Sequence, residues 1–474
     1  MLMSEQNDKK MKRSANSRFH DLMLRIVKII NAVAMAIPFA TAWYCYYASR
    51  IQAPFYRRGN WVVILLFLLL YSIFGRTYDA FLVSYNRISE MVYSQMLAVL
   101  ISDFILYIVI WLLSGHLLSI WPLLASIALS LLISAAWSIW THTWYFKTFR
   151  PRKSAVIWDQ REGLDNLIES YGLSKKFNIV KTASAEECIN DISILKGMQA
   201  VFLSGVHSHD RNIIIKYCIE NRISAFIIPR IGDVLMSGAH RMHMFHLPML
   251  RLERYHPGPE FLVIKRLFDI VASLIALVLV SPVMIIVAIL IRRDGGPAFY
   301  KQCRLTKDGK EFNVLKFRSM RVDAEKDGVA RLSTGENDDR ITPIGKVIRK
   351  FRIDELPQLL NILKGDMSIV GPRPERPEIA ELYEQVLPEF RLRLQAKCGL
   401  TGYAQVYGKY NTTPYDKLQM DLMYIANPSL AQDLSIIFAT IKILFMPEST
   451  EGIEAGATTA MISLDKLKEL QDKS

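Results

Sequence analysis

The segment Val271–Ile291, which reads VASLIALVLVSPVMIIVAILI, decides what kind of fold this chain of 474 residues can adopt. It is apolar and long enough to cross the roughly 30 Å hydrocarbon core of a membrane as a helix. Ser281 and Pro282 interrupt it near its centre. Because proline removes a backbone donor and its ring clashes with the preceding turn, the sequence predicts a sharp bend at this position.

Two topologies are open to such a bent helix. A kinked helix that crosses the membrane fully would place everything after Ile291 on the opposite side. The chain after Tyr300 is basic and carries motifs suited to phosphate groups, whose nucleotide ligands are found in the cytoplasm. We therefore favour a re-entrant helix over 265–292, which bends at Ser281-Pro282 and returns to the cytoplasmic side. The Ser281 hydroxyl is expected to bond a backbone group that the break leaves free.

Four further apolar segments lie within residues 1–150, and each is near the roughly 20 residues that a transmembrane helix needs. They are Leu24–Tyr47, Trp61–Leu82, Met91–Leu113 and Leu118–Trp140. Lysine and arginine residues lie before the first segment and after the fourth, whereas the loop 114–117 has neither. Since positively charged residues stay on the cytoplasmic side, we predict a four-helix transmembrane bundle with both ends in the cytoplasm.

Residues 151–256 form a second region, in which short apolar runs alternate with helical stretches, as in βαβ units around a parallel sheet. The runs are Ser154–Trp158, Phe177–Val180, Ala200–Leu203, Ser224–Ile228 and Leu247–Leu252. This pattern predicts a Rossmann-like α/β domain, but the Gly-x-Gly-x-x-Gly loop of dinucleotide-binding domains is missing after Trp158. We therefore expect no bound NAD here, and a role in assembly or regulation within a homodimer.

The charge balance points to anionic partners. The 58 lysine and arginine residues exceed the 45 aspartate and glutamate residues, which gives a formal net charge of +13. In a membrane protein such an excess serves topology, anionic lipid and phosphate groups, and we expect no nucleic acid partner. The five cysteines are scattered without a Cys-x-x-Cys pair, so neither a disulfide framework nor a structural zinc site is expected.

Basic and apolar residues are patterned together in the last part of the chain. Lys316 and Arg318 alternate beside a hydrophobic run, and in a strand both would point to one side. Ile344–Phe351 carries a one-sided apolar stripe opposite basic residues, which is typical of a helix lying on a membrane. A helix packed on the core of its own domain is an equally good interpretation. Leu434–Met446 is apolar but too short to span, and suits an interfacial helix.

Two adjacent carboxylates, Asp354 and Glu355, carry the chemistry. Neighbouring helical residues point about 100° apart, so one carboxylate can engage a metal while the other faces a substrate. Lys350 lies one turn before Asp354 and is expected to keep it ionised, which makes it a competent nucleophile toward phosphorus. Such a pair is usually solvated surface. The motif Gly371–Glu375 strengthens the functional interpretation, because its rigid Pro-Arg-Pro presents a guanidinium fork suited to phosphate.

Several motifs, taken in order, resemble those of the bacterial sugar transferase family, the monotopic polyprenyl-phosphate glycosyl-1-phosphate transferases. They are Lys316–Met320, Arg352–Gln358, Asn361–Ser368, Val370–Glu375 and Gly399–Val406. The resemblance covers Lys265 to about Pro447. The helices and α/β region before it are similar to the large form of the family, which starts capsule, O-antigen or exopolysaccharide units. It implies that residues 257–474 form a mainly α catalytic domain with a re-entrant helix and interfacial amphipathic helices.

The resemblance also implies an activity and roles for individual residues. It implies transfer of a sugar 1-phosphate, a hexose such as glucose or galactose, from a UDP-sugar to undecaprenyl phosphate, with release of UMP. Asp354 would be the nucleophile that forms an aspartyl phosphosugar, and Glu355 would hold Mg²⁺ with it. The resemblance assigns phosphate binding to Lys316, Arg318 and Arg373, and the membrane break to Ser281 and Pro282. It also places acidic positions without an assigned role at Asp421 and Asp433.

Two other classes of protein remain open at this stage. A membrane-anchored sensor or scaffold that regulates polysaccharide assembly would also use charged interfacial helices, but it would leave the carboxylate pair and the Pro-Arg-Pro loop without a purpose. A polytopic phosphosugar transferase would place its catalytic loops between spans, whereas here all the motifs follow the last apolar segment. We expect the protein in the bacterial inner membrane, with its middle and catalytic domains on the cytoplasmic side.

Overall fold

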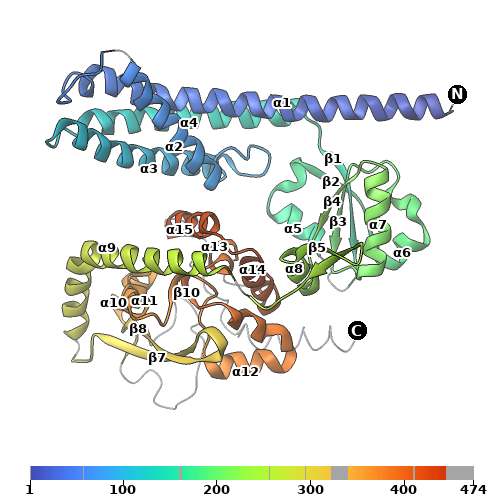
Figure 1. Ribbon diagram of the computed structural model, residues 1–474. Coiled ribbons are helices and arrows are strands. Elements are labelled where there is room, and N and C mark those ends of the chain that lie inside the picture. The colour runs from blue at the N-terminus through green and yellow to red at the C-terminus, as the bar shows by residue number, and fades with distance from the viewer. Residues whose placement is uncertain are drawn as a thin grey trace. The chain divides into compact units, whose positions relative to one another are not determined.

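The computed structural model describes residues 2–56, 58–159, 163–255, 257–293, 295–321, 340–408 and 412–444. The chain forms two compact units, Met1–Ile227 and Ile228–Ser474 (Figure 1). The first unit holds the N-terminal helices and a parallel sheet. Residues 228–256, which the sequence assigned to the middle domain, lie in the second unit.

The first unit begins with apolar helices long enough to cross a membrane. They are α1 (Leu2–Ala42), which the π-helical turn Trp43–Tyr47 continues, α2 (Arg58–Thr77), α3 (Ile88–Ser114) and α4 (Trp121–Thr148). Helix α1 packs against α2 and α4, and α3 packs against the same two helices. The prediction of apolar helices near the N-terminus is confirmed.

A buried polar network joins these four helices. The Tyr71 hydroxyl donates to Asn31 Oδ1 at 2.7 Å, and Asn31 Nδ2 donates to Gln95 Oε1 at 3.4 Å. The Ser134 hydroxyl donates to the same Gln95 oxygen at 2.8 Å. Since the four residues come from α2, α1, α3 and α4, one network contacts every helix. Polar side chains commonly join helices in this way where apolar surfaces cannot discriminate between helix and lipid.

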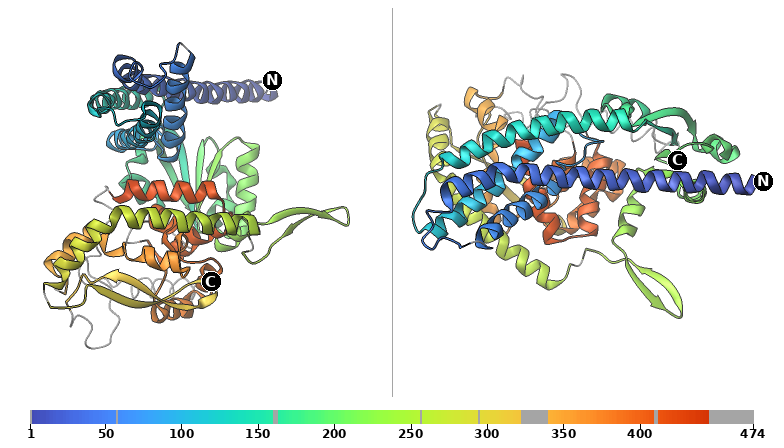
Figure 2. Two further views of the ribbon diagram at one scale, coloured as in Figure 1. Left: turned by 60° about the vertical axis from the view of Figure 1, so that its left-hand side comes forward. Right: turned by 90° about the horizontal axis from the view of Figure 1, so that it is seen from above.

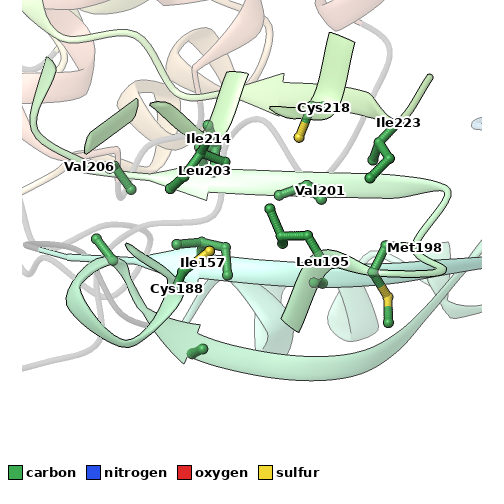
Figure 3. Close-up of a cluster of buried hydrophobic side chains, with 13 residues drawn as sticks. Ile157, Cys188, Leu195, Met198, Val201, Leu203, Val206, Ile214, Cys218 and Ile223 are labelled. Atoms are coloured by element: carbon green, nitrogen blue, oxygen red, sulfur yellow. The ribbon is translucent and has the colours of Figure 1, made fainter. Parts of the chain in front are cut away.

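A parallel sheet with strand order β2-β1-β3-β4 follows the helices. Its strands are β1 (Arg152–Trp158), β2 (Phe177–Ser184), β3 (Ala200–Ser204) and β4 (Ser224–Ile227). The helices between them are α5 (Leu164–Ser170), η2 (Leu173–Lys175), α6 (Ala185–Asn190), η3 (Ile192–Leu195) and α7 (Ser208–Glu220). Ile157 and Leu203 belong to one apolar cluster, drawn in Figure 3, and Val156 belongs to another. Both faces of the sheet are therefore covered, as parallel sheets require.

The fifth apolar run, Leu247–Leu252, was predicted as part of this sheet, and that prediction is wrong. The run contains β6 (Leu247–Arg251), which pairs antiparallel with β5 (His240–Met244) in a separate hairpin. Phe245 and His246 both have positive φ, as the tight turn of a two-residue hairpin requires. Figure 2 shows the hairpin extending away from the rest of its unit, and the Phe245 side chain is 78% exposed.

Helix α9 (Pro259–Arg292) contains the apolar segment Val271–Ile291. It changes direction sharply part-way along its length (Figures 1 and 2), and Pro282 lies inside it. Pro282 has no N–H to offer the carbonyl of Val278 four residues earlier. The Ser281 hydroxyl donates to that same oxygen at 2.9 Å, so the freed backbone group is satisfied locally. The predicted bend and the predicted compensation by Ser281 are both present.

The rest of the second unit is rich in short helices with small sheets between them. The hairpin β7 (Phe299–Leu305) and β8 (Glu311–Phe317) is antiparallel, and β9 (Ser368–Val370) and β10 (Gly399–Thr401) are parallel. The helices are α8 (Ile231–Ser237), η4 (Lys307–Gly309), α10 (Pro343–Lys350), η5 (Ile353–Glu355), α11 (Gln358–Lys364), α12 (Pro377–Val386), η6 (Pro388–Gln395), α13 (Tyr403–Tyr407), α14 (Pro414–Ala426) and α15 (Leu430–Leu444). The region is therefore mixed α/β, with helix predominating.

The first half of α9 is joined to this unit by charged side chains. Lys265 Nζ lies 2.6 Å from Asp433 Oδ2 on α15, and the Tyr424 hydroxyl donates to the other Asp433 oxygen at 2.8 Å. Asp269 accepts hydrogen bonds from the Ser368 hydroxyl and the Ile369 N–H. These contacts give Asp433, whose role the sequence left open, a structural function. They fix α9 by its polar residues and leave most of its apolar residues exposed.

The Lys265–Asp433 ion pair is expected to hold α9 against α15. Removing one partner of a buried pair leaves an uncompensated charge, which typically costs about 3–5 kcal/mol. We expect Lys265→Met to lower the Tm of the purified protein strongly, and Lys265→Met combined with Asp433→Leu to recover much of the loss. Thermal unfolding monitored by circular dichroism measures both. A single variant as stable as the wild type would contradict this role for the pair.

Candidate active site

The carboxylates Asp354 and Glu355 lie on η5, a single turn between α10 and α11. The residue before this turn, Arg352, has a φ of 53°, in the left-handed region that side chains other than glycine rarely adopt. Pro357 then begins α11 with a φ of −61°, the value that its ring dictates. The backbone thus turns just before the carboxylate pair and continues in a helical conformation after it, and a strained residue such as Arg352 is frequent at functional sites.

Glu355 is surrounded by cations from separate parts of the fold. Lys316 Nζ, at the end of β8, donates to Glu355 Oε1 at 3.0 Å, and Arg373 Nη2, in the loop after β9, approaches the same oxygen at 3.4 Å. Burial alone would raise the pKa of Glu355, but the charges of Lys316, Arg373 and Arg352 outweigh it and hold that pKa below the ordinary value. Glu355 is therefore an ionised, fixed carboxylate.

Asp354 has a different environment from Glu355. Among the described residues, its carboxylate makes no hydrogen bond or ion pair. Burial, followed by the negative charge of Glu355, raises the pKa of Asp354 to about 6, although Lys316 and Arg349 oppose the shift. Helical spacing predicts that Lys350 keeps Asp354 ionised, and the structure corrects this prediction. Arg349 supplies the nearby charge of α10, whereas Lys350 is exposed.

The Pro-Arg-Pro loop is held by two arginines that the sequence analysis did not single out. Arg304 Nη1 donates to the Pro374 carbonyl at 3.0 Å, and Arg393 Nη2 donates to the Arg373 carbonyl at 2.8 Å. Arg393 in turn forms an ion pair with buried Asp421 at 2.7 Å. Asp421 therefore acts at a distance from the pocket, because it fixes the arginine that fixes the loop carrying Arg373.

Close backbone approach explains the glycines around this loop. A Cβ atom on Gly371 would lie 2.2 Å from the Lys397 carbonyl oxygen, and one on Gly399 would lie 2.1 Å from the Gly371 nitrogen. A Cβ atom on Gly402 would likewise lie 2.2 Å from the Gly371 carbonyl oxygen. Any side chain at these positions would push β9 and β10 apart, and the glycines therefore determine where the Arg373 loop starts.

Arg318 is placed differently from what the sequence predicted. The alternation with Lys316 suggested that both cations face one phosphate site, but the strand ends at Phe317. Arg318 is buried, and it donates to the Pro297 carbonyl at 2.9 Å and to the Ile291 carbonyl in the last turn of α9 at 3.2 Å. This geometry favours a structural role for Arg318, which joins the end of α9 to the end of β8.

A small pocket lies beside Glu355. Its lining includes Arg304, Lys316, Glu355, Gln358, Arg373 and Gln405. Two of the predicted phosphate-binding residues, Lys316 and Arg373, are thus brought together with the carboxylate. Gln358 and Gln405 were missed as site residues, although both stand in quoted motifs, because an amide side chain gives no spacing signal in a single sequence.

The donor set at the pair suits a hard metal ion shared with a phosphate. Asp354 and Glu355 offer carboxylate oxygens, and within the described ranges no three histidine, cysteine or acidic residues gather around one point. Mg²⁺ commonly binds through one or two carboxylates, with substrate phosphates and water completing its coordination. The residues present therefore fit a Mg²⁺ ion that arrives with a phosphorylated substrate, and they do not form a complete protein cage.

Comparison with known proteins places this site in a family. The family model described as bacterial sugar transferase matches residues 261–447. The exopolysaccharide production protein PSS of Rhizobium leguminosarum bv. phaseoli is 44% identical over 190 residues, which are 38% of this chain and 94% of that protein.

Two longer relatives carry names that describe an activity. The UDP-N-acetylgalactosamine-undecaprenyl-phosphate N-acetylgalactosaminephosphotransferase of Aeromonas hydrophila is 38% identical over 231 residues, 48% of this chain and 53% of that protein. The undecaprenyl-phosphate galactose phosphotransferase of Salmonella typhimurium is 41% identical over 210 residues, 41% of this chain and 43% of that protein. The match thus spans about half the length of these two relatives. The carboxylate pair, Lys316, Arg373 and the bent half of α9 all lie inside the matched region, and the chain belongs to the bacterial sugar transferase family.

Proposed function

We propose that this protein transfers a sugar 1-phosphate from a UDP-sugar to undecaprenyl phosphate, which releases UMP and gives an undecaprenyl-diphospho-sugar. The names of the relatives support the two substrate classes. The observation that carries the proposal is the contrast between adjacent carboxylates: Glu355 is fixed by two cations, while Asp354 is free of hydrogen bonds and ion pairs within the described part of the chain. Such a pair can divide binding and attack between its members.

The reaction follows from that division. An Asp354 oxygen attacks the β-phosphorus of the UDP-sugar, a new O–P bond forms, and the bond to the α-phosphate oxygen breaks to release UMP. An oxygen of undecaprenyl phosphate then attacks the same phosphorus and frees Asp354. Lys316 and Arg373 face the phosphate charge throughout. When bound, Mg²⁺ held by Asp354 and Glu355 would neutralise the diphosphate as a Lewis acid.

A lipid substrate requires the site to lie at a membrane surface, and we propose that α9 enters and leaves the membrane on the cytoplasmic side. Most of its apolar residues are exposed within their own unit. The backbone carbonyl freed at the bend accepts a hydrogen bond from the Ser281 hydroxyl. Helix α10, which leads into η5, exposes Val347 and Phe351 beside basic residues, as a helix lying in the interface would. We place α15 in the interface because it is apolar and too short to span, and the whole protein in the inner membrane.

The sugar and the assembly are narrower proposals. We propose a hexose, glucose or galactose, as the transferred sugar. We also propose a homodimer in which the α/β region serves assembly or regulation and binds no nicotinamide nucleotide. Assembly as a dimer has separate support from the β5–β6 hairpin of the second unit, because Phe245, Leu247 and Leu250 are each more than half exposed on a sheet of only these two strands.

The covalent step gives the first test of this function. Wild-type protein incubated with UDP-sugar and Mg²⁺ but no lipid is expected to release up to one UMP per chain and to retain phosphosugar on the peptide around Asp354. Asp354→Asn should release none and should lose turnover by at least about 10³-fold, because an amide cannot form the acyl phosphate. UMP release by luminescence and peptide mass spectrometry measure both. Turnover near the wild-type level in Asp354→Asn would refute the assignment.

The protonation state of Asp354 gives a second test. Its pKa is raised to about 6, and only the ionised carboxylate attacks phosphorus. We therefore expect kcat/KM to fall as the pH is lowered through about 6 and to level off above it. In Arg349→Met, which removes a charge that stabilises the ionised form, this midpoint should move upward. The pH profile of initial rates measures it, and a profile that stays flat down to pH 5 would exclude Asp354 as the titrating nucleophile.

The topology of α9 gives a third test. Reporter tags at residue 150 and at the C-terminus are expected to be cytoplasmic in the unmodified protein. Replacing Ser281 and Pro282 by leucine restores a regular helix and should move part of the population to an external C-terminus. The activity of the reporter tags in intact cells shows on which side of the membrane each tag lies. An external C-terminus in the unmodified protein would rule out the re-entrant arrangement.

A further inference from the structure

Gln405 presents an acceptor without a donor in the wall of the pocket that holds Glu355. Gln405 lies on α13, and its Oε1 atom is buried and has no hydrogen-bond partner among the described residues. A buried acceptor without a partner is costly, because it has lost its water and gained nothing in return. Its position beside Lys316, Glu355 and Arg373 makes a ligand the natural source of the missing donor.

The orientation of the Gln405 amide is fixed by its other end. Gln405 Nε2 donates to the Leu400 carbonyl at 3.1 Å. A carbonyl oxygen can be matched only by the NH₂ group of an amide, so the flipped arrangement would set two acceptors against each other. The oxygen is therefore the end of the amide that is left without a protein partner, and a ligand in the pocket would have to bring an N–H or O–H to that point.

The substrate offers such a group next to its phosphates. The phosphate oxygens are acceptors, and they match the pocket cations Lys316, Arg304 and Arg373 rather than another oxygen. The donors on a UDP-sugar are its hydroxyls, any amide N–H and the uracil N–H. The sugar is attached directly to the β-phosphate, which Lys316 and Arg373 face in the proposed reaction, whereas the uracil is separated from it by the ribose and the α-phosphate.

We propose that Gln405 Oε1 accepts a hydrogen bond from a donor on the transferred sugar, at the position next to the anomeric carbon, and so helps to determine which sugars are accepted. This inference rests on the proposed function. The C2 substituent is the sugar donor nearest the phosphate, and it is a hydroxyl in glucose and galactose and an amide N–H in their N-acetylated forms. A site built around such a donor discriminates against a substrate that lacks it.

Binding and turnover test this role in the full-length protein. In the Asp354→Asn background, where substrate is not consumed, calorimetry compares UDP-glucose, UDP-galactose and UDP-N-acetylgalactosamine with UMP. Gln405→Met should weaken binding of the accepted UDP-sugar about tenfold and leave UMP binding unchanged. With Asp354 intact, the wild type should prefer the sugar over its 2-deoxy analogue by about tenfold in kcat/KM, and Gln405→Met should abolish that preference.

Gln432 provides the matched control. Its Oε1 atom is also buried without a partner among the described residues, but it lies on α15 and not in the pocket lining. Gln432→Met should leave sugar binding and discrimination unchanged. If the wild type turns over its UDP-sugar, either of two results would overturn the proposal. Gln405→Met weakens the binding of UDP-sugar and UMP equally, or it weakens neither. If the wild type neither binds nor turns over any UDP-sugar, the proposed function itself fails.

Discussion

A carboxylate buried beside a second carboxylate is stable only when cations surround it, and Glu355 meets this condition through Lys316 and Arg373. Neither cation is a neighbour in sequence. Lys316 comes at the end of a hairpin, and Arg373 comes from the loop that follows β9. The fold of the second unit can be understood as the means of delivering these two charges to one oxygen. The supporting arginines and Asp421 extend that requirement outward from the pocket.

The same cations leave Asp354 in a different condition from its neighbour. Lys316 and Arg373 are committed to Glu355, so Asp354 receives their charge at longer range and no hydrogen bond from the described residues. Its pKa therefore rises while that of Glu355 falls. Pairs of carboxylates whose environments separate their pKa values are typical of sites where one member binds and the other reacts. The left-handed backbone at Arg352 belongs to this arrangement, because it turns the chain so that both carboxylates can occupy one short helical turn.

The sequence predicted best where a single residue type has a local consequence. Pro282 bends a helix wherever it stands. It leaves the carbonyl four residues earlier without a donor, and spacing alone shows that Ser281 can reach this carbonyl. Predictions that depended on distant partners did less well. Helical spacing favours Lys350, four residues before Asp354, whereas Arg349 lies five residues before it and is brought near only by the fold. Arg318 alternates with Lys316, yet the strand ends between them and turns Arg318 toward the end of α9.

The remaining residues of the site could not have been found from local pattern at all. Arg304 and Arg393 act on backbone carbonyls of the Arg373 loop, and these contacts exist only after the chain has folded. Similarly, the apolar run Leu247–Leu252 looks like another strand of the parallel sheet, and it forms a hairpin because His240–Met244 is available to pair with it. In both cases the partner that the folded chain provides determines the contact, and the local sequence pattern does not.

Helix α9 is joined to the rest of the second unit by the same kind of charged contact. Its polar residues are used up by the domain: Lys265 by Asp433, Asp269 by β9, and its last-turn carbonyl by Arg318. Most of its large apolar side chains remain exposed, although Leu277 and Val280, just before the bend, pack on the core of the domain. A lipid phosphate that reaches the headgroup region could then meet a site whose two cations are already in place. Helix α9 and the carboxylate pair are therefore parts of one arrangement, because Lys316 near the end of β8 bonds Glu355, and Arg318 just after that strand bonds the last turn of α9.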